Sequence, residues 1–161
     1  MEYFIIFLPL FGAFVAGFFG NKFDQKYSQF MTSLFVSISS ILSIIVFFKV
    51  LNYGYSNNLL ISSWINSGTL NVNWSIKVDA LSSLMMVVVT LVSALVHIYS
   101  IGYMSHDPHK PRFMSYLSLF TFAMLVLVTS DNFLQLFFGW EGVGLCSYFL
   151  IGFWFKKKLQ M

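Results

Sequence analysis

Charge is scarce in this sequence of 161 residues. Asp, Glu, Lys and Arg together make up 9% of it, whereas 58% of the residues are hydrophobic and the mean hydropathy is +0.77. Soluble domains carry about 25% charged residues. The composition therefore excludes a soluble globular protein and indicates an integral membrane chain.

Cysteine is almost absent as well. The single cysteine, Cys146, excludes a disulfide within the chain, and a lone apolar-context cysteine more often packs than reacts. The three histidines and Cys146 do not occur at the spacings of metal ligands. The sequence also lacks a glycine-rich phosphate loop and a basic patch interleaved with aromatic residues. We therefore expect no metal or cofactor in this chain, and no nucleic-acid partner.

Long apolar runs are abundant, and they predict five membrane-spanning helices, because a helix needs about 20 apolar residues to cross a bilayer. The first run follows Glu2 without any lysine or arginine, and no clear small-residue cleavage site follows it, so we interpret it as a helix, bent at Pro9, and not as a signal peptide. We expect an all-α integral membrane fold, a single transmembrane domain over residues 1–161. The predicted spans cover residues 3–21, 27–48, 79–104, 113–130 and 132–155.

Residues 49–77, between the second and third spans, lack a helical pattern. Hydrophobic and polar residues alternate over residues 70–76, which is typical of a strand, and residues 66–68 supply a turn before it. We therefore predict a small β-hairpin outside the membrane, with Trp64 and Trp74 near the interface.

Basic residues are distributed unequally between the two sides that five spans create. The side of the C-terminus carries seven, and the other side carries two. The seven are Lys22, Lys26, Lys110, Arg112, Lys156, Lys157 and Lys158, and the two are Lys49 and Lys77. Since basic loops stay inside, this asymmetry predicts an outside N-terminus and a C-terminus in the cytoplasm or matrix.

Glu141 is an acidic residue in the middle of the fifth run. Along a helix it would lie roughly 15 Å from Asp131 and roughly 22 Å from Lys156, close to the centre of the bilayer. An ionisable group at that depth costs at least about 2.5 kcal/mol, so we expect it to face a helix bundle or a water-filled cavity. Gly139, Gly142 and Gly144 flank it and reduce bulk where a neighbouring backbone or water could approach.

Two interpretations of Glu141 remain open at this point. It can exchange protons, with a lysine that approaches and withdraws to release and reload them, or it can be a structural carboxyl that only holds helices together. We favour proton exchange, because an intramembrane acid marks function by default.

A polar stripe follows one face of the third span. Thr90, Ser93, His97 and Ser100 recur in steps of three or four, and Ser83 extends the stripe. A histidine on such a stripe can relay protons through water. It can equally be a satisfied hydrogen-bonding residue near the membrane end, which we favour slightly.

Two motifs resemble a known family. They are Leu95-Val-His-Ile-Tyr-Ser-Ile-Gly-Tyr-Met104 and Ser130-Asp-Asn-Phe-Leu-Gln-Leu-Phe-Phe-Gly-Trp-Glu-Gly-Val-Gly-Leu-Cys-Ser-Tyr-Phe-Leu-Ile-Gly-Phe-Trp154. Together they resemble NADH–ubiquinone oxidoreductase chain 5, the antiporter-like proton-pumping membrane subunit of respiratory complex I. The Gly-Trp-Glu-Gly-Val-Gly core is highly specific, and the match is best over residues 79–155.

The resemblance implies roles for particular residues. Glu141 corresponds to the family's key glutamate of the fifth helix, which pairs with a lysine on a later broken helix and takes part in proton pumping. We expect His97, Ser93, Thr90 and Tyr148 to support a polar path. The chain would be enzymatic only as a subunit of NADH:ubiquinone reductase (H+-translocating), with NADH, FMN, iron–sulfur clusters and ubiquinone bound by other subunits.

The chain is much shorter than members of this family, and all its lysines lie outside the predicted spans. We therefore expect the N-terminal piece of a split subunit, with a separate polypeptide of the same complex supplying a lysine near Glu141. The expected location is the mitochondrial inner membrane, with the N-terminus in the intermembrane space and the C-terminus in the matrix. A bacterial plasma membrane is the alternative.

Other functions share these sequence features. Subunits of cation/proton antiporters, membrane-bound hydrogenases and the plastid dehydrogenase complex carry a similar glutamate motif, and a truncated, non-conducting structural remnant is a different class. Co-purification with a flavin and iron–sulfur arm separates complex I from an antiporter, and Glu141→Gln separates pumping from a structural role.

Overall fold

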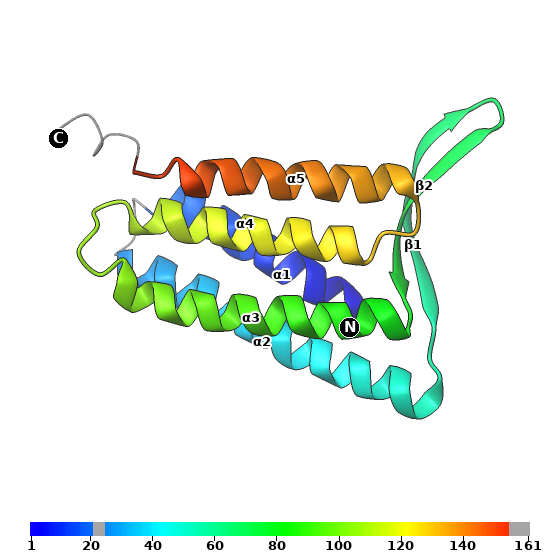
Figure 1. Cartoon of the computed structure of the whole chain (residues 1–161), viewed down its shortest axis with the longest axis horizontal. Helices are drawn as coiled ribbons and strands as arrows, with labels where there is room; N and C mark the ends of the chain where they lie inside the picture. The colour runs from blue at the N-terminus through cyan, green and yellow to red at the C-terminus, as the bar shows by residue number, and fades with distance from the viewer. Residues whose placement is uncertain (21–24, 155–161) are drawn as a thin grey trace.

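The structure is a computed structural model that describes residues 1–20 and 25–154. Five helices are long and apolar enough to cross a membrane. They are α1 (Glu2–Phe14) with its continuation as a π-helical turn, η1 (Val15–Phe19), α2 (Gln25–Tyr53), α3 (Ala80–Tyr103), α4 (Lys110–Val128) and α5 (Phe133–Ile151). A hairpin of two antiparallel strands, β1 (Asn57–Ser67) and β2 (Leu70–Val78), joins α2 to α3 (Figure 1). The predicted fold class is therefore confirmed.

The helices lie alongside one another, and the hairpin stands across one end of the bundle, which we call the hairpin end (Figure 1). α4 is central, since it contacts α1, α2, α3 and α5. α5 packs mainly on α4, and its fully buried residues are only Gln135, Gly139 and Cys146. It is therefore a peripheral helix with one covered face.

The first two helices differ from the predicted spans in detail. α1 runs through Pro9, and the regular helix changes at η1 instead, just before Gly20, where an added side chain would collide with Pro111 of α4. α2 extends to Tyr53, so the prediction that residues 49–53 are non-helical is wrong. The Lys49 ammonium lies 4.4 Å from the centre of the Tyr55 ring, a cation–π contact that suits the edge of a membrane better than a break in the helix.

The hairpin forms where the alternating pattern predicted it. Gly68 opens its two-residue loop with φ of +59°, a conformation that L side chains rarely adopt. β1 carries two extra residues, Ile61 and Trp64, which form bulges opposite β2. Trp64 and Trp74 stack edge to face with ring centroids 5.1 Å apart, and Phe138 of α5 lies 5.1 Å from Trp74. This aromatic cluster attaches the hairpin to α5.

α3 begins with a complete capping box. The Asp79 carboxylate accepts a hydrogen bond from the Ser82 N–H at 2.7 Å, and the Ser82 hydroxyl accepts one from the Asp79 N–H at 2.8 Å. The Ser82 hydrogen bond lowers the pKa of Asp79.

The main apolar core lies nearby, at the hairpin end, where β2 closes the bundle. Its buried members are Ile5, Ile6, Val46, Val50, Ile76, Val78, Met86, Leu125 and Val126.

Candidate functional site

Glu141 projects from the side of α5 that α4 does not cover. Gln135, Gly139 and Cys146 mark the covered face. Glu141 follows Gly139 by two residues, which is about 200° around a helix. The side chain is accordingly exposed in this chain, near the middle of α5.

The flanking glycines divide between the two sides of α5. A Cβ atom added at Gly139 would lie 2.8 Å from the Leu127 Cα, and one added at Gly142 would lie 3.2 Å from the Ala123 Cβ. An atom added at Gly144 would meet nothing within 4 Å. The predicted approach of a neighbouring backbone is thus found at Gly139, and Gly144 faces open space.

A row of exposed side chains accompanies Glu141. We call it the open face of α5, and it consists of Phe137, Glu141, Gly144, Leu145 and Tyr148. These positions are spaced by three or four residues, so they share one side of the helix. Tyr148 is 72% exposed and lies two turns beyond Glu141, on the same side.

Within the described residues, no hydrogen bond or ion pair joins Glu141 to another side chain. The basic groups lie at the ends of the bundle. Lys77 pairs with Asp131 at 3.9 Å at the hairpin end, and Arg112 donates to the Tyr116 hydroxyl at 2.8 Å at the opposite end. A cation for Glu141 therefore has to come from outside the described part of the chain.

His97 lies between α3 and α4 and is fully buried. Its Nδ1 lies 2.8 Å from the carbonyl oxygen of Ser93, which can only accept, so Nδ1 carries the hydrogen. In the neutral ring Nε2 then accepts from the Ser118 hydroxyl at 3.2 Å. Ser93 is also hydrogen-bonded to the Thr121 hydroxyl. Both ring nitrogens are satisfied, as the structural interpretation of His97 requires.

Thr90 joins α3 to α2. Its hydroxyl lies 2.8 Å from that of Ser43, and both residues are fully buried. The stripe of Thr90, Ser93 and His97 therefore lies in the seams that α3 makes with α2 and α4. Glu141 and Tyr148 lie on the open face of α5, beyond α4 (Figure 1). The structure groups the predicted polar residues into two sets, and a path that connects the sets stays a prediction.

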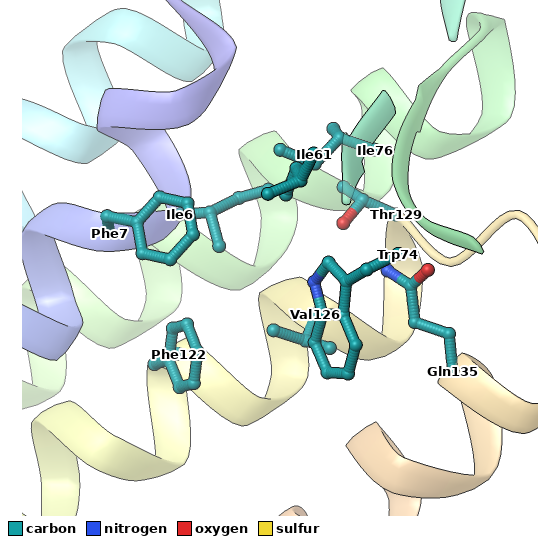
Figure 2. Close-up of a pocket in the computed structure, with 9 residues that line it drawn as sticks. All are labelled: Ile6, Phe7, Ile61, Trp74, Ile76, Phe122, Val126, Thr129 and Gln135. Atoms are coloured by element: carbon teal, nitrogen blue, oxygen red, sulfur yellow. The ribbon is translucent and has the colours of Figure 1, made fainter. Parts of the chain in front are cut away.

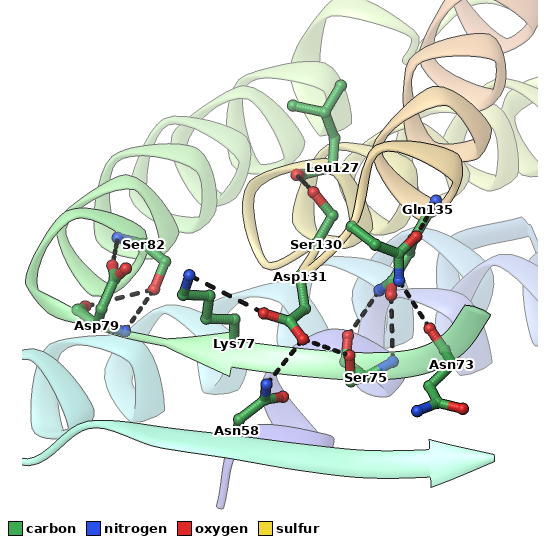
Figure 3. Close-up of polar contacts among 11 residues, drawn as sticks. Asn58, Asn73, Ser75, Lys77, Asp79, Ser82, Leu127, Ser130, Asp131 and Gln135 are labelled. Atoms are coloured by element: carbon green, nitrogen blue, oxygen red, sulfur yellow. Dashed lines mark hydrogen bonds and ion pairs between the residues drawn. The ribbon is translucent and has the colours of Figure 1, made fainter. Parts of the chain in front are cut away.

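The sequence interpretation missed Gln135. It is fully buried, its Nε2 donates to the Ser75 carbonyl at 2.7 Å, and its Oε1 accepts from the Ser75 N–H at 3.1 Å (Figure 3). Asn132 donates to the Asn73 carbonyl at 2.8 Å, and Asn58 donates to Asp131 at 2.7 Å. An amide one turn inside an apolar helix was the available signal, because it needs a partner when buried.

A small pocket of about 110 Å³ lies beside this junction (Figure 2). Ile6, Phe122 and Trp74 make it apolar, and the Gln135 amide at its edge is already bonded to Ser75. It offers no free polar group to a ligand. Nor do the described residues contain three His, Cys, Asp or Glu side chains grouped for a metal ion.

Comparisons with known proteins define the class. Residues 64–114 match the family described as NADH-ubiquinone oxidoreductase (complex I), chain 5 N-terminus. Residues 130–161 match the family described as NADH:quinone oxidoreductase/Mrp antiporter, TM. With its membrane-spanning helices and the acid on α5, the chain is a multi-pass, antiporter-like membrane subunit.

Curated relatives narrow the class to one family. The chain is 56% identical over 153 residues to NADH-ubiquinone oxidoreductase chain 5 of Arabidopsis thaliana and 54% identical over 153 residues to that of Phytophthora infestans. It is 52% identical over 154 residues to NADH-quinone oxidoreductase subunit L of Rickettsia conorii. These matches cover 95% or 96% of the chain but only 23% of each relative. The chain belongs to the NADH-ubiquinone oxidoreductase chain 5 family and corresponds to its N-terminal region.

Proposed function

We propose that this chain forms the N-terminal part of a proton-translocating membrane subunit of respiratory complex I. Glu141 would bind and release the translocated protons, while other subunits oxidise NADH and reduce ubiquinone with FMN and iron–sulfur clusters. The observation that carries this proposal is the position of Glu141, halfway along a membrane-spanning helix, on a face that no other described element covers.

The cost of a buried charge explains why that face matters. A carboxylate that faces lipid at mid-bilayer is unfavourable by at least about 2.5 kcal/mol. We infer that further helices pack on the open face of α5 and that one of them brings a cation next to Glu141. A nearby cation stabilises the carboxylate, and its withdrawal favours protonation, so movement of the cation couples to uptake and release of a proton.

The relatives extend far beyond the matched region, since the chain spans 23% of their length. We propose that a separate polypeptide of the same complex carries the partner helices. Mass spectrometry of the purified complex tests this point. A single polypeptide with the full length of the relatives would contradict it.

We also propose the mitochondrial inner membrane as the location, with the N-terminus and the hairpin in the intermembrane space and the far end of α5 toward the matrix. The seven-to-two distribution of basic residues supports this orientation. Protease cleavage of the hairpin in intact mitochondria lacking an outer membrane tests it, and protection of the hairpin there would reverse the assignment.

The decisive experiment is Glu141→Gln, which preserves size and removes the titrating proton. We expect the complex to assemble, and proton translocation per NADH oxidised to fall, in sealed membrane vesicles. Asp79→Asn is the matched control, because it also removes a carboxylate but lies at the helix start and keeps a capping side chain. Unchanged translocation by assembled Glu141→Gln would favour the non-conducting structural role.

A second candidate is a subunit of a cation/proton antiporter, because the family that matches residues 130–161 includes the Mrp antiporter in its description. Purification distinguishes the two. A flavin and iron–sulfur arm that co-purifies with the chain supports complex I, and its absence supports the antiporter.

A further inference from the structure

We propose that Gln135 is a positioning residue for Glu141: its amide clamps α5 to β2 and fixes the rotation of the helix that aims Glu141 at the open face. This inference rests on the proposed function only where it concerns pumping. Its geometric part stands on the α5–hairpin junction shown in Figure 3.

Gln135 uses both ends of its amide on one backbone residue. It donates to the Ser75 carbonyl and accepts from the Ser75 N–H, at 2.7 and 3.1 Å. In a two-stranded hairpin, part of the backbone N–H and C=O groups point away from the partner strand. Gln135 satisfies such a pair on β2, much as another strand would. Two parallel hydrogen bonds to a buried group fix direction as well as distance.

Rotation of α5 is set at two points on its covered face. Gln135 holds Ser75, and Gly139, one turn later, lies against the Leu127 backbone. A step of one residue around the helix is about 100°. A slip of that size would bury Glu141 against α4 or turn it to another side of the bundle. The two contacts therefore decide where the carboxyl points.

The other contacts of the junction lie outside this part of the helix. Asp131 and Asn132 precede α5 and hold its start, through Asn58 and the Asn73 carbonyl. Phe138 packs on Trp74, but ring contacts tolerate small rotations. Gln135 is thus the directional polar contact made from within α5 to the hairpin.

The test compares Gln135→Met with Gln29→Met in the assembled complex. Gln29 is a matched control: it is 5% exposed, lies in α2, and its Nε2 has no hydrogen-bond partner among the described residues. In each background, thiols introduced singly by Glu141→Cys or Val143→Cys are alkylated, and mass spectrometry of this chain measures the rates. We expect the ratio of the two rates to change at least threefold with Gln135→Met and to stay at its wild-type value with Gln29→Met.

Gln135→Glu supplies a second variant if Gln135→Met fails to assemble. A protonated carboxyl can accept from the Ser75 N–H and donate to its carbonyl, whereas a carboxylate cannot donate. The ionisable groups described around the junction are Asp131 on α5 and Lys77 on β2, and residues 127–129 of α4 carry none. The labelling ratio of this variant should be wild-type in acid and should diverge as the pH rises. A ratio independent of pH would overturn the proposal.

Pumping measurements separate this proposal from the function on which it draws. We expect Gln135→Met to shift the pH dependence of proton translocation, which a loss of stability alone would not do. A changed labelling ratio with normal pumping by Glu141→Gln would refute the proton role and leave the positioning role standing. An unchanged ratio with pumping lost in Glu141→Gln would refute the positioning role alone.

Discussion

Gly139 of α5 lies directly against Leu127 of α4, so closely that a Cβ atom on the glycine would stand 2.8 Å from both the Leu127 N and Cα atoms. Because these are backbone atoms, they cannot move aside without displacing α4. We expect Gly139→Ala to destabilise the assembled subunit by about 1–3 kcal/mol, the usual range for overpacking.

Thermal dissociation of the complex, followed on native gels, measures this effect. Gly102→Ala is the control, since an added Cβ there meets nothing within 4 Å in this chain. Equal stability of the two variants would show that α4 and α5 are not packed as described.

The hydrogen bond between Thr90 and Ser43 makes a second prediction. Both hydroxyls also bond to carbonyl groups of their own helices, Thr90 to Met86 and Ser43 to Ser40. We expect a double-mutant cycle of Thr90→Val and Ser43→Ala to give a coupling energy of about 0.6 kcal/mol, as found for hydrogen bonds between membrane helices. Unfolding of the purified chain in detergent measures it. Strict additivity would mean that the two hydroxyls do not bond.

His97 tests the polar stripe. We expect His97→Leu to lower the amount of assembled subunit, because it leaves the Ser118 hydroxyl without the Nε2 partner in a buried seam. His97→Gln should assemble in wild-type amounts, since an amide can both donate and accept. Proton translocation by that variant then decides between the interpretations: wild-type rates support a structural histidine, and a tenfold fall supports a titrating relay.

Asp79 makes a prediction about pH. Hydrogen bonding from Ser82 lowers its pKa below the ordinary value of 3.8, so the folded state binds the proton less readily than the unfolded state. The stabilisation is present above that value and is lost as the pH falls through the lower folded-state pKa. Asp79→Ala should cost about 1 kcal/mol at neutral pH, which is typical of a lost helix cap.

Asp79→Asn keeps a capping oxygen without the charge, so its stability should depend less on pH below about 4 than that of the wild type. Thermal unfolding of the purified chain, monitored by circular dichroism at neutral and acidic pH, measures both variants. Parallel pH curves for Asp79→Asn and wild type would contradict the assignment.

The number of spans and the hairpin were predictable because both depend on local patterns. Long apolar runs require a bilayer, and the alternation over residues 70–76 requires a sheet face. The end of α2 was missed by five residues, because Lys49 and Asn52 are acceptable in a helix that leaves the membrane. The predicted end of the fifth span at residue 155 lies outside the described residues, where α5 is followed to Ile151.

The site was predictable in identity but not in arrangement. Glu141 stands out in the sequence as an acid in an apolar run, whereas the direction in which it points depends on which face of α5 meets α4. That face is marked by Gly139 and by Gln135, whose partner, Ser75, is 60 residues away in the sequence. A contact of this range leaves no periodic trace in the letters.

The clasp between Gln135 and Ser75 also has a consequence for biogenesis. Polypeptides emerge from the ribosome N-terminus first, so β2 leaves before α5 does. The receptor for the last helix is therefore complete when that helix enters the membrane, and α5 can be oriented on arrival by a template that earlier residues have already built.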